Sequence, residues 1–303
     1  MNYSLLRESK VIVFYDGRTY EFDALSNVSA GVDFQEYKTN RKTIHRKSNY
    51  AISKITAQNP SSVSLSVYIT STLVETNFFK WMGMERHDNT FILPETSGLE
   101  PEYLDLFIVN PNRQVIKASR CFVANVDFSL DKSIPILNVA LEAAKVEKVL
   151  DVPASGSIIQ GTVLPYSPVS VESLSREYLG VTGTSLSFQQ QCNWRDQRSV
   201  HDIGTIYTQK RAYISEMNAS ATVNLYNISS GVGIPQGFEL EPSYGNNIRI
   251  YNKYLSIEMP YTRITKRLDT GDVFTMALDI IPLPSPTPVT ITFLGEENYA
   301  KLT

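Results

Sequence analysis

The sequence of 303 residues contains only two cysteines and three histidines. Cys121 and Cys192 lie far apart and show no C-x-x-C spacing, which argues against a disulfide framework and against a cysteine zinc site. His45, His87 and His201 each lack a second histidine, cysteine or carboxylate at the spacing that a metal site requires. We therefore expect no metal ion and no cofactor.

Excess charge of one sign and long hydrophobic runs are also missing. The 28 Lys and Arg residues nearly balance the 31 Asp and Glu residues, so the chain lacks the basic signature of a general nucleic-acid binder. No apolar run approaches the roughly 20 residues of a membrane span, and residues 1–8 lack the pattern of a signal peptide. We expect a soluble chain, made in the cytoplasm and not inserted in a membrane.

The signature motifs of common enzyme classes are absent as well. The sequence has no GxSxG, HExxH, GxxxxGK[ST] or GxGxxG motif. Glu95, Glu100 and Glu102 could in principle supply a glycosidase pair, but an apparent loop of solvated acids explains them better. We therefore expect no catalytic residues and no enzymatic activity.

What the sequence does contain is a series of short alternating segments between turn residues. From Val63 to Ile69 every second residue is apolar, which places Ser64, Ser66 and Tyr68 on the opposite face. The segment from Cys121 to Phe128 alternates in the same way. These patterns predict a mainly β protein built from half-buried antiparallel strands.

One segment has the periodicity of a helix. Val74, Phe78, Trp81 and Met82 form an apolar stripe, and Gly83 can end the helix. Thr72 and Glu75 fit a capping box, so we expect a helix from about Thr72 to Gly83 that packs on a sheet.

The two halves of the chain resemble each other. Phe34 aligns with Phe188, Tyr68 with Tyr226, Phe128 with Tyr261 and Leu141 with Leu278, in the same order. Chance similarity among strands rich in Ser and Val is the alternative. Residues 153–171 are rich in Pro, Gly and Ser and are typical of a linker. We expect a first β domain at 1–152 and a second at 172–303, which lacks the helix and ends in a Pro-rich C-terminal arm of open role.

Two long polar segments occupy equivalent places after Phe34 and Phe188. The first spans residues 38–47 and the second residues 193–202. Nucleic-acid recognition and a plain solvated loop are alternatives, but we interpret both as loops that contact protein. Their basic residues are Lys38, Arg41, Lys42, Arg46 and Lys47 in the first segment and Arg195 and Arg198 in the second.

This tandem pair of antiparallel units, each with a long polar loop and one with a helix, resembles the tail-tube superfamily of long-tailed bacteriophages. The resemblance covers roughly residues 10–150 and 172–282 and rests on pattern and duplication. It implies two tandem sandwich or barrel units of the tube type. Such units form rings of six around a channel and stack through the long loop, so a duplicated chain closes as a homotrimer with pseudo-sixfold symmetry. Because the second unit lacks the helix, a homohexamer stays open.

The resemblance also implies a function. We expect a structural protein of the virion tail that encloses the tape-measure protein, contacts neighbouring tail or baseplate proteins and lets DNA pass without specific binding. A tube-initiating or hub protein of the baseplate is the first alternative, and a β-sandwich module that binds or hydrolyses carbohydrate is the second. The sequence does not determine how many rings form, which host the phage infects or whether a contractile sheath surrounds the tube. The polar faces expected to line the channel, unless they are ordinary solvent faces, comprise Ser64, Ser66, Tyr68, Thr222, Asn224 and Tyr226.

Overall fold

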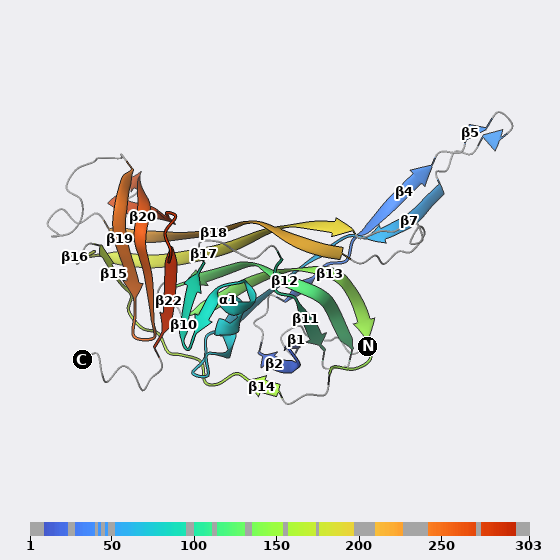
Figure 1. The fold of residues 1–303 in the computed structure, drawn as a ribbon, viewed down its shortest axis with the longest axis horizontal. Helices are drawn as coiled ribbons and strands as arrows, with labels where there is room; N and C mark the ends of the chain where they lie inside the picture. The colour runs from blue at the N-terminus through green and yellow to red at the C-terminus, as the bar shows by residue number, and fades with distance from the viewer. Residues whose placement is uncertain are drawn as a thin grey trace.

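The computed structural model shows a mainly β protein with one short helix and one large curled sheet, which confirms the predicted fold class (Figure 1). It describes residues 9–23, 28–39, 42–43, 46–47, 52–94, 100–110, 114–130, 135–153, 157–173, 176–196, 210–226, 242–270 and 274–294. The strands of the first half are β1 (Lys10–Tyr15), β2 (Arg18–Phe22), β3 (Ser29–Ala30), β4 (Phe34–Thr39), β5 (Lys42–Thr43), β6 (Arg46–Lys47), β7 (Ile52–Gln58), β8 (Ser61–Tyr68), β9 (Glu85–His87), β10 (Thr90–Leu93), β11 (Leu104–Val109), β12 (Val115–Ser129) and β13 (Ile136–Val149). They are followed by β14 (Ser157–Ile159), β15 (Ser170–Ser173), β16 (Arg176–Glu177), β17 (Val181–Asp196), β18 (Lys210–Tyr226), β19 (Ser243–Tyr251), β20 (Leu255–Thr270), β21 (Phe274–Pro282) and β22 (Val289–Phe293).

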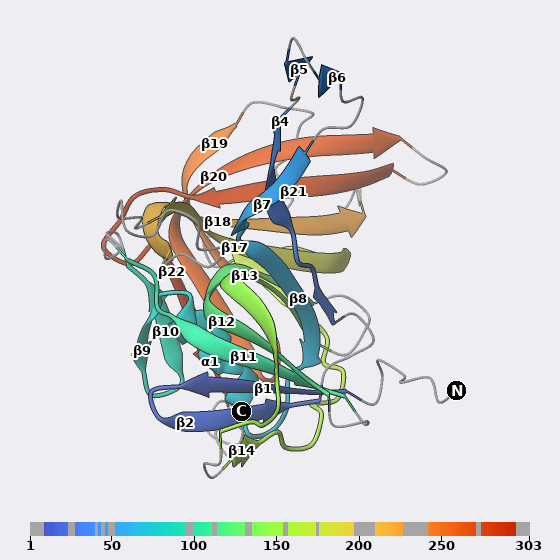
Figure 2. The ribbon, with the colours of Figure 1, turned by 90° about the vertical axis from the view of Figure 1, so that its right-hand side faces the viewer.

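Eight of these strands form one antiparallel ladder across the whole molecule. Its order is β3, β8, β13, β12, β17, β18, β21 and β20, and we call it the eight-strand ladder. Figure 2 shows β20, β21, β18, β17, β13 and β8 following one another across the view. The two halves meet inside this ladder, where residues 125–129 of β12 pair with residues 185–189 of β17.

The halves repeat the same topology. In the first half β1 pairs with β2 and β11, and β11 pairs with β12. In the second half β15 pairs with β16 and β19, and β19 pairs with β20. Both long strands, β12 and β20, therefore begin beside an outer strand and end in the eight-strand ladder. Residues 69–103 separate β8 from β11, whereas residues 227–242 separate β18 from β19, so the helix lies in an insertion of the first half.

A shared bulge fixes the alignment of the two repeats. In the β4–β7 hairpin the Thr56 hydroxyl donates a hydrogen bond to the Gln35 carbonyl at 3.1 Å. In the β17–β18 hairpin the Ser215 hydroxyl donates to the Gln191 carbonyl at 3.0 Å, at the same kind of register shift. Gln35 is therefore equivalent to Gln191.

The alignment made from the sequence differs from this one at three of its four pairs. Following the ladder pairings, Tyr68 is equivalent to Tyr226 as expected, but Val32 rather than Phe34 is equivalent to Phe188. In the same way Leu141 corresponds to Ile280, and Phe128 corresponds to Leu268. A strand pattern of period two fits several registers almost equally well, and the strands must pair before one register is selected.

The helix forms where it was predicted but is shorter. A 3-10 turn, η2 (Val74–Thr76), leads into α1 (Asn77–Trp81), and the predicted apolar stripe is buried. Gly83 follows with a φ of 93°, a left-handed conformation that glycine adopts without strain. The predicted capping box is wrong, because neither helical segment has a side-chain N-cap.

Glu75 instead binds residues on both sides of the start of the helical insertion. Its buried carboxylate accepts hydrogen bonds from the Thr70 amide at 3.2 Å, from the Thr70 hydroxyl at 2.7 Å and from the Gln160 amide group. Thr72 accepts a hydrogen bond from the Gly161 amide at 2.9 Å. The capping-box pair thus attaches residues 160–161 to the start of the helix.

Residues 153–171 and the C-terminal arm both make ordered contacts. β14 pairs in parallel with β2, and Thr70 forms an isolated bridge with Val163. After the Pro-rich residues 282–288, β22 pairs with β10 of the first half and with β20 of the second. The domain boundaries predicted at 152 and 172 stay a prediction, while strand pairing joins the two halves.

The hydrophobic core is also continuous between the halves. Phe79 of α1 packs edge-on against Phe188 of β17 at a ring distance of 5.7 Å and against Phe293 of β22 at 6.0 Å. Phe79 and Phe188 belong to the same cluster of buried residues. The core lies on one side of the eight-strand ladder and leaves the other side free for polar residues.

Candidate functional site

The side of the eight-strand ladder that faces away from the core is lined by polar side chains in register. Asp127 of β12 lies opposite Asn138 of β13 on one side and opposite Ser187 of β17 on the other. The row continues outward to Ser66 of β8 and to Ser220 of β18. A polar row therefore crosses the junction of the two halves without interruption.

A second row runs parallel to the first. Ser129 lies opposite Ser185, which lies opposite Thr222, and Thr222 lies opposite Asp279 of β21. Asp279 in turn lies opposite Thr265 of β20. Residues of both rows surround a shallow hollow of about 340 Å³ at the junction, lined mainly by hydroxyl, amide and carboxylate groups. We call this surface, with its two rows, the polar face.

Hydrogen bonds between neighbouring strands order the polar face. The Ser66 hydroxyl donates to the Asn138 side-chain oxygen at 2.6 Å, and the hydroxyls of Ser29 and Ser64 are 2.7 Å apart. Within β12 the Asn125 amide group donates to Asp127 at 2.8 Å. These bonds connect polar side chains within and between the strands of the polar face.

The polar face carries little charge, and the charge it carries is mostly negative. Arg267 forms an ion pair with Asp279 at 2.7 Å, so this pair is neutral as a whole. Asp127 adds a carboxylate whose bonded neighbour is a neutral amide. Among the described residues of the polar face named above, the basic group Arg267 is engaged by Asp279, and the other side chains are hydroxyl, amide and carboxylate groups, which do not attract phosphate.

The residues predicted to line a channel all lie on this side of the strands, but their exposure differs. Asn224 and Tyr226 are exposed, whereas Ser64, Tyr68 and Thr222 are half-buried. Ser66 is only 7% exposed, because it lies between strands and is bonded to Asn138. Asp127, Asn138, Ser187 and Ser220 complete the face and were not in the predicted set, although the alternation from Cys121 to Phe128 already placed Asp127 on the polar side.

A hairpin of the first half projects away from this sheet. β4 and β7 form a separate two-stranded sheet, and the shorter β5–β6 pair lies farther out along the same projection (Figure 1). At its base the Asn59 amide donates to the Asp33 carbonyl at 3.0 Å, and the Asn59 side chain donates to the Asp33 carboxylate at 2.9 Å. These bonds join the two strands of the hairpin where it leaves the ladder.

The projecting hairpin carries most of the predicted contact residues. Lys38 lies in β4, Lys42 in β5, and Arg46 and Lys47 in β6. Arg41 lies outside the described residues. The described backbone therefore places four of the five basic positions on the projection.

The equivalent hairpin of the second half packs on the body of the first. The Trp194 indole donates to Glu142 at 2.8 Å and packs on Phe122 at a ring distance of 5.2 Å. Arg195 lies 4.7 Å from the Tyr213 ring centroid, and Arg198 is outside the described residues. Within the described residues, the first hairpin leaves the body and the second, as far as Asp196 and from Lys210 on, lies against it.

A second hollow lies where β12, β13, β17 and β18 meet, and it contains one of the two cysteines. Cys192 lines this hollow together with Glu142 and Gln190. Burial, and to a lesser extent the negative charge of Glu142, raises the pKa of the Cys192 thiol to about 12. A thiol with this pKa is protonated at neutral pH and is a poor nucleophile.

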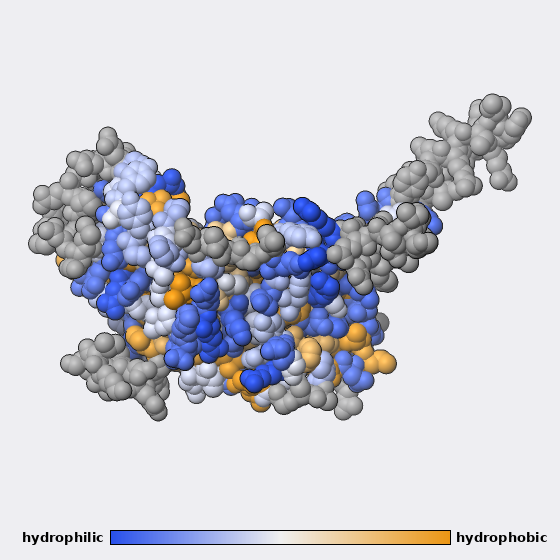
Figure 3. Space-filling model, viewed as in Figure 1, coloured by the Kyte–Doolittle hydropathy of each residue, from blue (hydrophilic) through white to orange (hydrophobic). Residues whose placement is uncertain are grey.

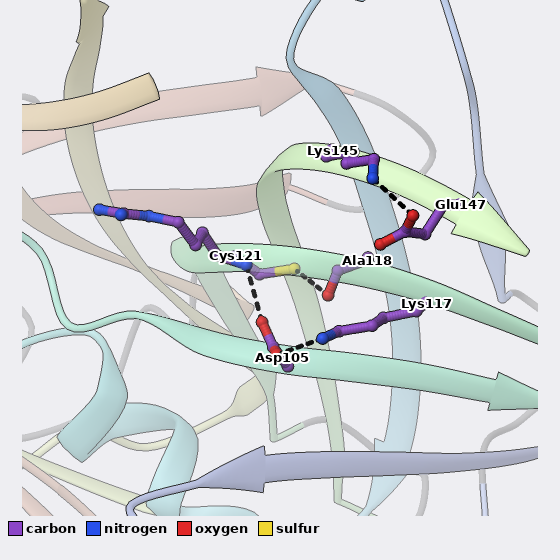
Figure 4. Close-up of polar contacts among 7 residues, drawn as sticks. Asp105, Lys117, Ala118, Cys121, Lys145 and Glu147 are labelled. Atoms are coloured by element: carbon purple, nitrogen blue, oxygen red, sulfur yellow. Dashed lines mark hydrogen bonds and ion pairs between the residues drawn. The ribbon is translucent and has the colours of Figure 1, made fainter. Parts of the chain in front are cut away.

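The other cysteine lies at the bend of β12 (Figure 4). The Asp105 carboxylate accepts a hydrogen bond from the Arg120 amide at 2.9 Å and pairs with Lys117 at 2.7 Å. Arg120 has a φ of 50°, and Cys121 beside it is fully buried, which raises the pKa of its thiol. This arrangement stabilises the register shift at which β12 turns from the outer strands toward the ladder.

The described residues include no group of three or more His, Cys, Asp or Glu side chains that could hold a metal ion. Within the same residues, no helix is long and apolar enough to cross a membrane. Hydrophilic residues dominate the view of the surface in Figure 3, with small apolar areas between them.

Comparison with known proteins identifies the family. The model of the Bacteriophage Baseplate Tube Protein Family matches residues 1–298. Baseplate tube protein p140 of Escherichia phage T5 is 48% identical over 299 residues, which cover 98% of this chain and 100% of the relative. The chain belongs to the bacteriophage baseplate tube protein family, and its role is that of a structural protein of the phage tail tube at the baseplate.

Proposed function

We propose that copies of this chain form a ring in the virion tail, with the polar face of each eight-strand ladder turned toward a central channel. The ring encloses the tape-measure protein before infection and conducts DNA during it. Three copies close the ring, because each chain contributes two equivalent units to a pseudo-sixfold arrangement; six copies are the alternative. Synthesis and assembly take place in the host cytoplasm.

The observation that carries this proposal is the continuity of the polar face across the junction of the repeats. Asp127 and Ser187 come from different halves and still share one row with Asn138 and Ser220. Strand pairing with the core on one side places these residues on one face. In a ring, the same alignment would continue the surface from each unit to the next.

The chemistry of the polar face suits the passage of DNA. Hydroxyl and amide groups bind water, and the carboxylate of Asp127 repels phosphate. The guanidinium of Arg267 is paired with Asp279. DNA therefore meets no row of unpaired cations, and strong phosphate binding, which would slow its transit, is avoided.

The projecting hairpin supports contacts along the tail axis. Its basic positions, with Arg41 between β4 and β5, form the inter-ring contact loop in this proposal, and it meets carboxylates on a neighbouring tail or baseplate protein. Arg195 contacts the Tyr213 ring on a hairpin that packs on the body, so we assign it a smaller part in this contact. Arg198, outside the described residues, stays part of the proposed contact loop. The family description supports a place at the baseplate end rather than along a long polymer.

Trp194 is the residue on which a carbohydrate-binding alternative depends. It contacts Phe122 and donates to Glu142 within the body, so its indole is engaged in packing. We therefore propose no carbohydrate-binding or enzymatic role.

The conduit role is tested by placing a cation on the polar face. Asn224→Lys and Ser220→Lys change exposed residues of β18, so folding and assembly stay intact. The new cations bind passing phosphates, and we expect slower DNA release at low salt and recovery at high salt. Asn89→Lys changes an exposed asparagine next to β10 and is the matched control. An unchanged release rate in particles shown to contain the Lys variants contradicts the proposal.

A further inference from the structure

The junction between the two repeats provides a template for a junction between two chains. Within the chain, residues 125–129 of β12 pair antiparallel with residues 185–189 of β17. The ladder pairings make β20 the equivalent of β12, with Arg267 in the place of Asp127. The ladder pairings also make segment 29–33 the equivalent of 185–189. The bulge shared by Gln35 and Gln191 gives the same alignment.

Both equivalent segments lie at the edges of the ladder. The pairing of β19 with β20 ends at Ile264, and among the described strands only β21 pairs with residues 265–270. At the other edge, β3 pairs only with β8 in the described part of the chain. In the described part of the chain these are two open strand edges, and open edges promote pairing with another chain.

The side chains at these edges are less buried than their equivalents at the internal junction. Within the chain Phe128, Leu186 and Phe188 close the core at the junction and are at most 3% exposed. Their equivalents Leu268 and Ala30 are only partly buried, and Val32 is 48% exposed. A second chain that repeats the internal junction would cover all three.

We propose that the edge of β20 in one copy pairs antiparallel with residues 29–33 of the next copy, in the register of the internal junction. This inference rests on the proposed ring and names the surfaces that close it. In this register Leu268 lies opposite Ala30, Lys266 opposite Val32, and Arg267 opposite Gly31. Each copy pairs its β20 edge with one neighbour and its 29–33 edge with the other, so the contact is head-to-tail. Such contacts close a ring when the rotation from one copy to the next adds up to a full turn.

The register is tested by disulfide formation between copies. Leu268→Cys and Ala30→Cys place two thiols opposite each other on adjacent antiparallel strands, within the Cα range of a disulfide. Leu268→Cys with Gly31→Cys is the matched control, because adjacent residues of a strand point to opposite faces. The unmodified full-length chain, whose own thiols are buried or half-buried, is the blank.

We expect mild oxidation of the first pair to convert more than half of the chains to covalent dimers and larger closed species, at least tenfold more than the control pair. Rings that show no crosslink above the blank, or equal crosslinks in both pairs, overturn the edge pairing but leave the ring intact. A parent chain that forms no ring overturns both.

A second variant covers the case in which the cysteine pair does not fold. Val32→Lys changes a side chain that is already exposed, so the monomer keeps its fold, while in the proposed register it places a second positive charge opposite Lys266 of the next copy. Leu150→Lys, at a residue 87% exposed, is the control. We expect Val32→Lys to need at least tenfold more protein for half-assembly. Equal assembly of the Val32→Lys variant and the parent chain overturns the pairing.

Discussion

Asp127 of β12 lies directly opposite Ser187 of β17, and these residues come from different halves of the chain. The strand pairing at this point makes one ladder from two repeats and one polar face from two surfaces. The same pairing places Phe188 beneath the ladder against Phe79 of the helix. The junction therefore determines both the stability of the chain and the surface that it presents.

The first prediction concerns the cooperativity of the two halves. Because the core is continuous, we expect both halves to unfold in one transition. Trp81 reports on the first half and Trp194 on the second, so the variants Trp81→Phe and Trp194→Phe each leave one fluorescent probe. In denaturant unfolding, the tryptophan fluorescence of each variant should change at the same denaturant concentration as its circular dichroism, which reports on the whole chain. Two separated transitions would show that the halves are independent domains.

The second prediction concerns Phe188, which is 2% exposed. Phe188→Ala removes a ring from the shared core, and we expect the free energy of unfolding to fall by about 3–5 kcal/mol. Phe34→Ala, at a residue 38% exposed, is the control and should change the stability far less. Equal losses in the two variants would mean that the junction is not packed as described.

The third prediction concerns Glu75, the buried carboxylate that joins the helix to residues 160–161. Glu75→Ala leaves the Thr70 amide and hydroxyl and the Gln160 amide group without their acceptor. We expect a loss of about 2–3 kcal/mol in the free energy of unfolding. Glu85→Ala changes an exposed glutamate of β9 and should be nearly neutral. Thermal or urea unfolding checks both, and a neutral Glu75→Ala would contradict the assignment.

The fourth prediction concerns the two thiols. The pKa of Cys192 is raised to about 12, and the pKa of Cys121 is also raised by burial. A raised pKa lowers the fraction of thiolate at any given pH, so at pH 8 Cys192 holds about 1,000-fold less thiolate than a thiol with a pKa of 9. Labelling of the folded chain by a thiol reagent should be slow at pH 8 and should accelerate as the pH rises. Rapid labelling of Cys192 at pH 8 would be inconsistent with its burial.

The fifth prediction concerns the projecting hairpin. Reversing the charge at Arg41, Lys42 and Arg46 should weaken the association of the ring with its neighbour and leave the subunit folded. Each exposed ion pair contributes only about 0.2–1 kcal/mol, and salt screens it, so the effect should be largest at low salt. Charge reversal at Arg18, Lys80 and Lys148, exposed on the body, is the control. Association that is unaffected by the hairpin variant would remove the hairpin from the contact.

In β8 the strand and its faces could be predicted from the sequence, because alternation determines which residues of a regular strand share a face. Val63, Leu65 and Val67 are buried, and Ser64 and Tyr68 lie on the opposite side, as expected. In β12 the predicted alternation from Cys121 to Phe128 is wrong before Asn125, because a bulge puts Val123 rather than Phe122 in the core. The pairing between strands could not be predicted in the same way. The equivalence of Phe128 and Leu268 depends on which residues of β13 and β21 lie opposite, and these pairs are far apart in the chain.

The different surroundings of the two hairpins also arise from long-range contacts. The polar segments after Phe34 and Phe188 look alike in the sequence, but the first hairpin leaves the ladder at the contact between Asn59 and Asp33. Trp194 holds the second against Phe122 and Glu142. Likewise the capping-box spacing of Thr72 and Glu75 is correct for a helix start, yet both residues bind the distant segment at 160–161.

Negative-stain electron microscopy of the purified full-length chain, combined with mass measurement of the crosslinked particle, tests the central claim most directly. The claim predicts rings with a central hole and a mass of three chains, or of six in the alternative arrangement. Particles that remain single chains at high concentration, and that show no ring when neighbouring tail proteins are added, would contradict it.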